Sequence, residues 1–365
     1  MKTTRHLFRH TPFALAALCA AVGAQAQTSS SSVNLYGVLD ACVVSYGSAT
    51  GPRVLVNGGG CYYGSRFGFR GTEDLGGGLR AYFVLESGFN ADNGTLAQGG
   101  RIFGRRSLVG LAGGFGSLDL GRDYAPAFYV LQPVDPMQLG IGAASATMWT
   151  GAPGTQVGRT DNSINYVTPD FGGFTARIQL APGEQAAPLA SRGGDTKGIN
   201  LLYRGQKLIA GIAYADVRNA AGNASDTATT LAVRYDFGKF SLGAAAQSGA
   251  WEGTRTAAAP ASTTSIFSRR FHSYMAGGSV KLGADTLSAT YKRYDDRTAA
   301  NFDATVLSAV YIHPLSKRTQ LYAGISRLKN LRASSYGAFD GNGAYSGVAP
   351  GGSSRIIDLG ITHFF

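Results

Sequence analysis

Arginine is the residue whose number and spacing most directly suggest a chemical role. The sequence contains 25 arginines and only 8 lysines. A guanidinium group stays charged and can hold a carboxylate or a phosphate through two parallel N–H donors. Five arginines occur in short polar motifs in the first half of the chain, at Arg66, Arg70, Arg105, Arg106 and Arg159. If these side chains face one common space, they attract anions into it, and this role involves no chemical reaction.

The other reactive residue types give little support to catalysis. Hydrolysis by a serine nucleophile usually needs a base near the serine. After residue 26 the only imidazoles are His272, His313 and His363, and no G-x-S-x-G element surrounds a candidate serine. Two cysteines and three distant histidines do not have the spacing of a metal site. We predict no enzyme activity, no metal and no cofactor, with a barrel hydrolase as a minor alternative that a hydrolase assay with inhibitors tests.

The first 26 residues have the pattern of a secretory signal peptide. One lysine and two arginines precede an apolar run, which ends in the small-x-small sequence Ala24-Gln25-Ala26. Cleavage after Ala26 leaves residues 27–365, which are 339 residues with a formal net charge of +8. We predict that this mature chain is a single domain.

The two cysteines that remain after cleavage are in an oxidising compartment. Cys42 and Cys61 are 19 residues apart and flank a glycine-rich stretch that is predicted to be a loop between two strands. A disulfide that staples this hairpin is one interpretation, and two unrelated thiols are the other.

The composition excludes several classes of protein. Hydrophobic residues make up 44% of the chain and charged residues 15%, and 52 residues are glycine. The aromatic content is too high and the charge too low for a disordered chain. Beyond residue 30 no stretch provides the ~18 consecutive apolar residues that a spanning helix needs. The basic residues are spread along the chain and form no patch that indicates nucleic-acid binding.

Segments of about ten residues with alternating polarity recur along the chain. In the segment 65–71, for example, Phe67 and Phe69 point one way and Arg66 and Arg70 the other. Sixteen such segments are predicted as strands, at 33–46, 62–70, 78–89, 101–112, 117–124, 162–168, 174–182, 196–204, 206–217, 227–236, 239–249, 271–283, 286–296, 303–312, 318–329 and 354–365.

The connections decide between a soluble sandwich and a membrane barrel, because both have alternating strands. Short turns alternate with longer polar loops at 47–61, 90–100, 125–161, 183–195, 250–270 and 330–353. An even number of strands with short turns at one end and long loops at the other is typical of an outer-membrane barrel. The predicted fold is an all-β membrane protein, a 16-stranded antiparallel transmembrane β-barrel.

Several motifs resemble those of Gram-negative general porins of the β-proteobacterial type. The matching motifs are VNLYGVLD at 33–40, SRFGFRGTEDLGGGL at 65–79, LESGF at 85–89, GRRS at 104–107, FGSLDLGR at 115–122, NSINY at 162–166, PDFGGF at 169–174 and SKRT at 316–319. The likeness runs over the whole mature chain and is strongest between residues 33 and 174. It implies a trimer in the outer membrane, each subunit with a water-filled pore for small hydrophilic solutes and ions.

The resemblance also implies that the long third loop, 125–161, folds into the lumen and narrows it. Loops of this length usually have a function, and Asp135 is the only charged residue between 125 and 156. Such an apolar loop needs a surface to pack against, and the inner wall of a wide barrel offers one.

The resemblance implies that, as in anion-selective members of the family, arginines line the narrow point opposite an acidic residue. The positions that match are Arg66, Arg105 and Arg159, with Glu86 as the acid. Arg106 has the opposite strand parity to Arg105, so it is expected outside the constriction, at an interface or paired with an acid. Further pore-lining candidates are Arg70, Asp40, Asp123 and Asp135.

Rings of arginine favour anions, and an aqueous lumen screens them over a Debye length of about 8 Å. We therefore predict a general diffusion porin with a weak to moderate preference for anions. A substrate-specific channel for anionic solutes or sugars is the alternative, since aromatic residues of the third loop could stack on a sugar. A role as an adhesin, through the outer loops, is a minor alternative. The expected partners are two further copies of the chain, outer-membrane lipid and lipopolysaccharide, inorganic anions, and the barrel-assembly machinery. The resemblance implies that this machinery reads the terminal Phe365, and the alternative is that Phe365 is only the last aromatic residue of the interfacial girdle.

Overall fold

The computed structural model describes residues 31–47, 53–140, 158–183, 193–218, 222, 224–251, 270–297, 299, 301–332, 334–336 and 348–365. The predicted signal peptide, 1–26, lies outside these residues. The strands are β1 (Ser32–Gly47), β2 (Arg53–Asn57), β3 (Arg66–Gly76), β4 (Leu79–Gly88), β5 (Arg106–Gly113), β6 (Gly116–Tyr124), β7 (Arg159–Val167), β8 (Phe174–Ala181), β9 (Thr196–Arg204), β10 (Leu208–Arg218), β11 (Ser225–Asp236), β12 (Phe240–Trp251), β13 (Arg270–Leu282), β14 (Asp285–Asp296), β15 (Ala304–Pro314), β16 (Thr319–Asn330) and β17 (Ser353–Phe364).

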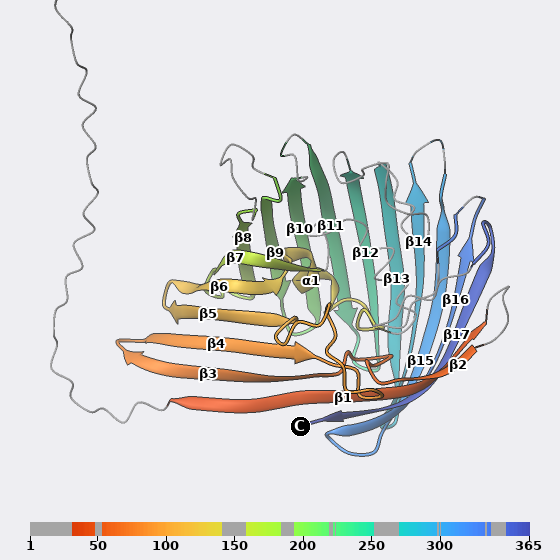
Figure 1. The fold of residues 1–365 in the computed structure, drawn as a ribbon, viewed down its shortest axis with the longest axis horizontal. Helices are drawn as coiled ribbons and strands as arrows, with labels where there is room; N and C mark the ends of the chain where they lie inside the picture. The colour runs from red at the N-terminus through yellow and green to blue at the C-terminus, as the bar shows by residue number, and fades with distance from the viewer. Residues whose placement is uncertain are drawn as a thin grey trace, which may run out of the picture.

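These strands form one closed antiparallel barrel, as the sequence predicted (Figure 1). From β3 onwards each strand pairs with the next, and β17 returns to β1 through ten residue pairs from Val38↔Phe364 to Gly47↔Arg355. A closed sheet has no unpaired edge, which is the condition for placing strands in lipid. The barrel has sixteen strand positions, because β2 and β3 both pair with the same side of β1.

The second strand position differs from the prediction. Residues 47–61 were expected to be a loop and 62–70 a strand, but β2 occupies residues 53–57 and pairs with the second half of β1. The chain then leaves the wall over residues 58–65 and rejoins it as β3. We call this interruption segment 58–65, and it brings an inserted piece of chain close to Arg66.

The two faces of the wall have opposite character. Side chains at one parity are large, apolar and exposed, among them Leu35, Val109, Leu231 and Leu359. The pairing register carries the same parity from strand to strand, so these side chains form the outer surface that contacts lipid. The other parity faces the lumen.

The two ends of the barrel also differ. Short turns join β3 to β4, β5 to β6, β11 to β12 and β13 to β14. Glycines at φ values that other residues avoid make these turns, for example Gly77 at φ +59° and Gly238 at φ +94°. The strand ends that flank the longer connections all lie at the opposite end, which we call the long-loop end.

The first part of the long third loop lies against the inner wall. It contains α1 (Pro126–Leu131), and we call residues 125–140 segment 125–140. The lumen-facing amide of Asn200 donates to the carbonyl of Pro126 (2.8 Å), and a Cβ added to the lumen-facing Gly211 would meet Val130. Residues 141–157 lie outside the described residues, so insertion of the whole loop remains a prediction. Among the described residues, no helix is long and apolar enough to cross a membrane.

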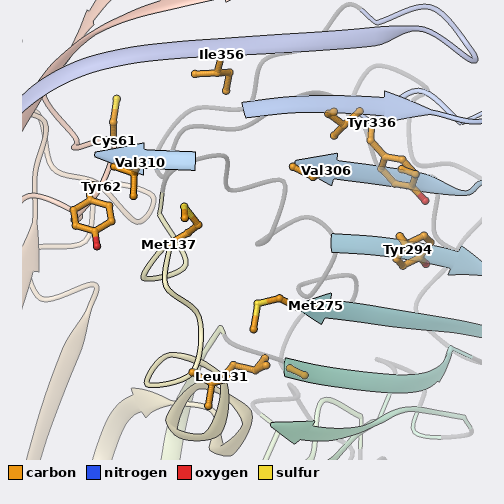
Figure 2. Close-up of a cluster of buried hydrophobic side chains, with 14 of the residues drawn as sticks. Cys61, Tyr62, Leu131, Met137, Met275, Tyr294, Val306, Val310, Tyr336 and Ile356 are labelled. Atoms are coloured by element: carbon orange, nitrogen blue, oxygen red, sulfur yellow. The ribbon is translucent and has the colours of Figure 1, made fainter. Parts of the chain in front are cut away.

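A buried apolar cluster fixes segment 125–140 to one side of the lumen. Figure 2 shows Leu131 and Met137 together with Cys61 and Tyr62 of segment 58–65 and with lumen-facing side chains of β13 to β17. The lumen-facing members from these strands include Met275, Tyr294, Val306, Val310 and Ile356. Much of the wall from β10 to β17 is therefore packed against inserted chain, and the remaining cavities are bordered by polar side chains of β3 to β7 and of β11 to β14.

Candidate functional site

The arginines singled out by the sequence meet at the long-loop end of β3 to β7. Arg66 begins β3, Glu86 is near the end of β4, and Arg105 immediately precedes β5. Tyr124 ends β6 and Arg159 begins β7. Adjacent strands thus present these side chains at neighbouring positions of one wall.

Glu86 is the carboxylate at the centre of this group. Its Oε1 accepts a hydrogen bond from Nε of Arg105 at 2.7 Å, and its Oε2 lies 3.8 Å from Nε of Arg66. The hydroxyl of Tyr36 also donates to Oε2 at 3.0 Å. Glu86 is only 7% exposed, so two guanidinium groups and a phenol compensate its buried charge.

Tyr124 connects the two remaining arginines. Its hydroxyl accepts hydrogen bonds from Arg105 Nη2 (2.8 Å) and from Arg159 Nη2 (2.7 Å). The Arg159 guanidinium also lies 4.4 Å from the centre of the Tyr124 ring, within cation–π range. The other face of this ring stacks on Phe128 of α1 at 3.8 Å. One tyrosine therefore positions two cations and joins the wall to segment 125–140.

These side chains line a cavity of about 540 Å³. Arg66, Arg105, Arg106 and Arg159 contribute its cations and Glu86 its one carboxylate, so the lining carries a net charge of +3. Segment 125–140 lines the other side with uncharged residues, among them Gln132, Gln138 and Leu139. The arrangement attracts anions from one wall.

A second ionic cluster lies beside the first and was only partly predicted. Asp123 accepts from Arg106 Nε at 2.7 Å and from Arg177 Nη1 at 3.3 Å. The hydroxyl of Tyr129, in α1, donates to the same carboxylate at 2.8 Å. Burial and the neighbouring Asp123 raise the pKa of Tyr129, which keeps this donor protonated. Arg177 and Tyr129 belong to no recognised motif, and only the polar parity of β8 could have indicated Arg177.

Arg106 corrects the parity argument. Arg106 pairs with an acid, Asp123, as predicted, and it also lines the cavity, which strand parity did not predict. The reason is that β5 begins at Arg106, where the lumen-facing alternation of that strand starts. Arg105 precedes the strand and reaches the same space from the incoming loop.

Asp40 faces inward, but it does not border open lumen. Its carboxylate accepts hydrogen bonds from the backbone N–H groups of Cys61 (2.9 Å) and Tyr63 (3.1 Å). The hydroxyls of Tyr322 (2.7 Å) and Thr362 (2.6 Å) complete its shell. The side chain is fully buried, so its role is to hold segment 58–65 against the wall.

Two other predicted pore-lining acids are also buried. Asp123 is completely inaccessible in its cluster, and Asp135 is 1% exposed. Asp135 forms a 2.8 Å ion pair with Lys292 on β14 and caps the backbone N–H of Met137 at 2.9 Å. The pair fastens segment 125–140 to the far wall. The three aspartates therefore organise inserted chain, and none adds a solvent-facing negative charge.

The remaining predicted residues lie around this centre. Arg70 is on β3, closer to the short-turn end than Arg66, with its guanidinium 5.2 Å from the ring of Tyr36. Cys42 and Cys61 are joined as a disulfide, which ties segment 58–65 to β1. Phe365 exchanges two backbone hydrogen bonds with Gly37 at the β1–β17 seam.

The described part of the chain offers no group of three or more histidine, cysteine or acidic side chains that could hold a metal ion. Glu86, the one carboxylate that borders the cavity, and the neighbouring Asp123 are already bound by arginine and tyrosine donors. The site is thus organised to interact with mobile anions through fixed positive charge.

Comparisons with known proteins agree with this arrangement. A family model described as Gram-negative porin matches residues 14–333. Outer membrane porin protein 32 of Delftia acidovorans is 36% identical over 369 residues, covering 96% of this chain and 98% of the relative. An outer membrane porin protein of Bordetella pertussis is 33% identical over 341 residues, covering 84% of this chain and 83% of the relative. The solved anion-selective porin from Comamonas acidovorans superposes with a TM-score of 0.77 at 32% identity, covering 92% of this chain and 100% of that one.

Proposed function

The chain belongs to the Gram-negative porin family and is an outer-membrane porin, and we propose that its channel passes small hydrophilic solutes with a preference for anions. The observation that carries this preference is the lining of the cavity, where four arginines face one carboxylate. Fixed positive charge in an aqueous pore favours anions. The similar porin from Comamonas acidovorans is anion-selective, which supports the same property here.

We propose that Arg66, Glu86, Arg105 and Arg159 form the constriction, with segment 125–140 as its opposite side. Their mutual contacts and the common cavity support this assignment. Arg106 belongs to the same lining. Arg70 extends the positive wall toward the short-turn end.

A substrate-specific channel for anionic solutes or sugars is the second candidate. The observation in its favour is the Tyr124–Phe128 stack beside the arginines, which could hold a planar or sugar-like solute that also carries negative charge. Such a channel shows saturable flux and current block by its solute, whereas a general porin shows neither.

We also propose the processing and assembly that the family implies. Residues 1–26 are removed, residues 27–365 form the mature barrel, and three copies assemble in contact with outer-membrane lipid and lipopolysaccharide. The terminal Phe365, docked on Gly37 at the seam, suits recognition by the barrel-assembly machinery. In this proposal the protein is a channel and has no enzymatic activity.

The test is single-channel recording of the purified protein in a planar bilayer under a KCl gradient. Conductance steps in groups of three with an anionic reversal potential support the proposal. A cationic reversal potential contradicts the anion preference. Folded protein that conducts only weakly and is blocked by a sugar or an organic anion favours the specific channel.

A further inference from the structure

The outer surface of the barrel carries a group of cations near the long-loop end of β13 to β17. These residues are Arg270, Arg293, Arg297, Arg327, Lys329 and Arg355, and all six are exposed. We call them the basic belt. The five that lie in strands have the outward parity of the lipid-facing residues beside them, such as Ile325 and Ile357. In Figure 1 the strands that carry the belt stand side by side in the wall.

Most of the belt's charge is not neutralised by the protein. Arg297 pairs with Asp295 at 3.2 Å, and Arg293 pairs with Asp303 at 3.5 Å. Within the described residues the other four cations form no ion pair. Exposed cations at the rim of a lipid-facing surface attract the anionic head groups of neighbouring lipids.

Next to the belt lies a polar hollow of about 560 Å³. Thr227 and Thr229 of β11, Ser248 of β12, and Arg270 and His272 of β13 line it, together with Arg297. Hydroxyl and guanidinium donors in one concave surface are suited to phosphate oxygens. We call this site the polar hollow.

Directly below it on the same strands is an apolar groove of about 740 Å³. The small side chains of Ala210, Ala244 and Ala246 form the floor of the groove. The larger side chains of Leu201, Leu231 and Tyr274 form its sides. Its volume is within the range of ligand pockets in proteins. An acyl chain fits a groove of this lining, which offers almost no hydrogen-bonding group.

The polar hollow and the apolar groove are continuous. Three successive rows of paired residues run from polar to apolar: Thr227, Ala250 and Arg270; then Thr229, Ser248 and His272; then Leu231, Ala246 and Tyr274. Nδ1 of His272 is 2.9 Å from the hydroxyl of Tyr274, which joins the two parts. The surface therefore has a cationic, hydroxyl-rich head region and an apolar tail region in line with the strands.

We propose that this surface is a binding site for a phosphorylated lipid of the outer leaflet, with phosphate in the polar hollow and acyl chain in the apolar groove. The inference rests on the outer-membrane location and deepens the lipid contact of the proposed function. In outer-membrane barrels the long loops are extracellular, so the basic belt is at the level of outer-leaflet head groups. Free phosphate would use only the hollow, and an uncharged lipid only the groove.

The test measures lipid binding to the purified, full-length assembly by native mass spectrometry. The probes are bisphosphorylated lipid A, the same lipid after removal of both phosphates, and inorganic pyrophosphate. Arg270→Ala/Arg297→Ala removes two cations from the hollow, and Ala246→Phe fills the groove. Lys317→Ala/Arg318→Ala is the matched control, since it removes two cations from the opposite, short-turn end of the barrel.

The expected result is tight binding of lipid A alone among the three probes. A cation near the lipid surface contributes about a fivefold factor, so Arg270→Ala/Arg297→Ala binds about 25-fold more weakly. A phenylalanine that displaces two methylenes of the chain weakens binding about 15-fold. The control keeps the wild-type affinity. If Arg270→Ala/Arg297→Ala fails to fold, Arg270→Gln/Arg297→Gln removes the same two charges from the hollow with less loss of side-chain volume.

Three results overturn the proposal: equal binding of the dephosphorylated lipid, pyrophosphate binding as tight as that of lipid A, or an equal loss in the control. Channel recording on the same preparations separates this outcome from failure of the proposed function. Normal anion-selective conductance without lipid binding leaves the porin assignment intact and removes only the lipid site.

Discussion

The proposed constriction provides a pair of substitutions that change its charge in opposite directions. Arg66→Gln lowers the net charge of the cavity lining from +3 to +2, and Glu86→Gln raises it to +4. Arg66 is suited to this test because its side chain is 22% exposed and its contact with Glu86 is the longer of the two, at 3.8 Å. In Glu86→Gln the amide oxygen can still accept the hydrogen bond of Tyr36.

The size of the effect follows from Coulomb's law in an aqueous lumen. A unit charge and an ion about 6 Å apart interact by roughly 0.7 kcal/mol at a dielectric constant of about 80. Screening with a Debye length of about 8 Å reduces this to about 0.3 kcal/mol at physiological salt. Anions and cations respond with opposite signs, so the permeability ratio changes by about 0.6 kcal/mol, which is about threefold per charge.

The assay is the reversal potential across a planar bilayer with a KCl gradient, for wild type and both variants. We expect the chloride-to-potassium permeability ratio to fall about threefold in Arg66→Gln and to rise about threefold in Glu86→Gln. Arg66→Lys keeps the charge and serves as the control, with a ratio close to wild type. Both shifts shrink at about 1 M salt, where the Debye length is about 3 Å.

Two results refute this reasoning. One is a shift of the same sign in both variants, which would mean that pore geometry and not charge determines selectivity. The other is an unchanged ratio in Arg66→Gln at low salt, which would place Arg66 outside the ion pathway.

Three further predictions concern the supports of the site. Lys292→Met leaves the Asp135 carboxylate buried without its cation, at a cost of about 3–5 kcal/mol. Because this ion pair fastens segment 125–140 to the wall, we expect larger and noisier single-channel currents. Replacing Asp135 by Asn in the same variant should restore quiet openings. Asp40→Ala removes an acceptor of four hydrogen bonds, and segment 58–65 should then exchange its backbone amide hydrogens at least tenfold faster, by mass spectrometry, while β14 is unchanged. Gly37→Val places a side chain where the ring of Phe365 lies, so barrel closure should slow severalfold, seen as delayed appearance of the heat-modifiable folded band on gels.

Much of the fold could be predicted because alternation and turn chemistry are local signals. Fourteen of the sixteen predicted strands lie within about three residues of their observed bounds, which is the precision that boundary prediction allows. The second and fourth strands were placed less well. In both cases loop residues next to the strand contain alternating aromatic or basic residues that look like strand, such as Tyr62 and Arg105.

The candidate site was predicted in its parts but not in its contacts. Motif resemblance supplied Arg66, Glu86 and Arg105, and the structure brings them within ion-pair distance. The sequence could not indicate that Asp40 would be covered by segment 58–65, because burial there depends on Tyr322, 282 residues away. The sequence likewise does not distinguish Lys292 from other lysines in strands, because its partner, Asp135, is on segment 125–140.

The seam between β1 and β17 has a consequence for how the protein is made. Val38 pairs with Phe364, so the barrel's closing contacts join residues at nearly opposite ends of the chain. Contacts of such high sequence separation form late, because the whole intervening chain must first be ordered. The final hydrogen bonds cannot form before β17 has been synthesised and exported. Until then β1 and whichever strand is last in place both present open edges, and this interval is when the chain most depends on protection from aggregation.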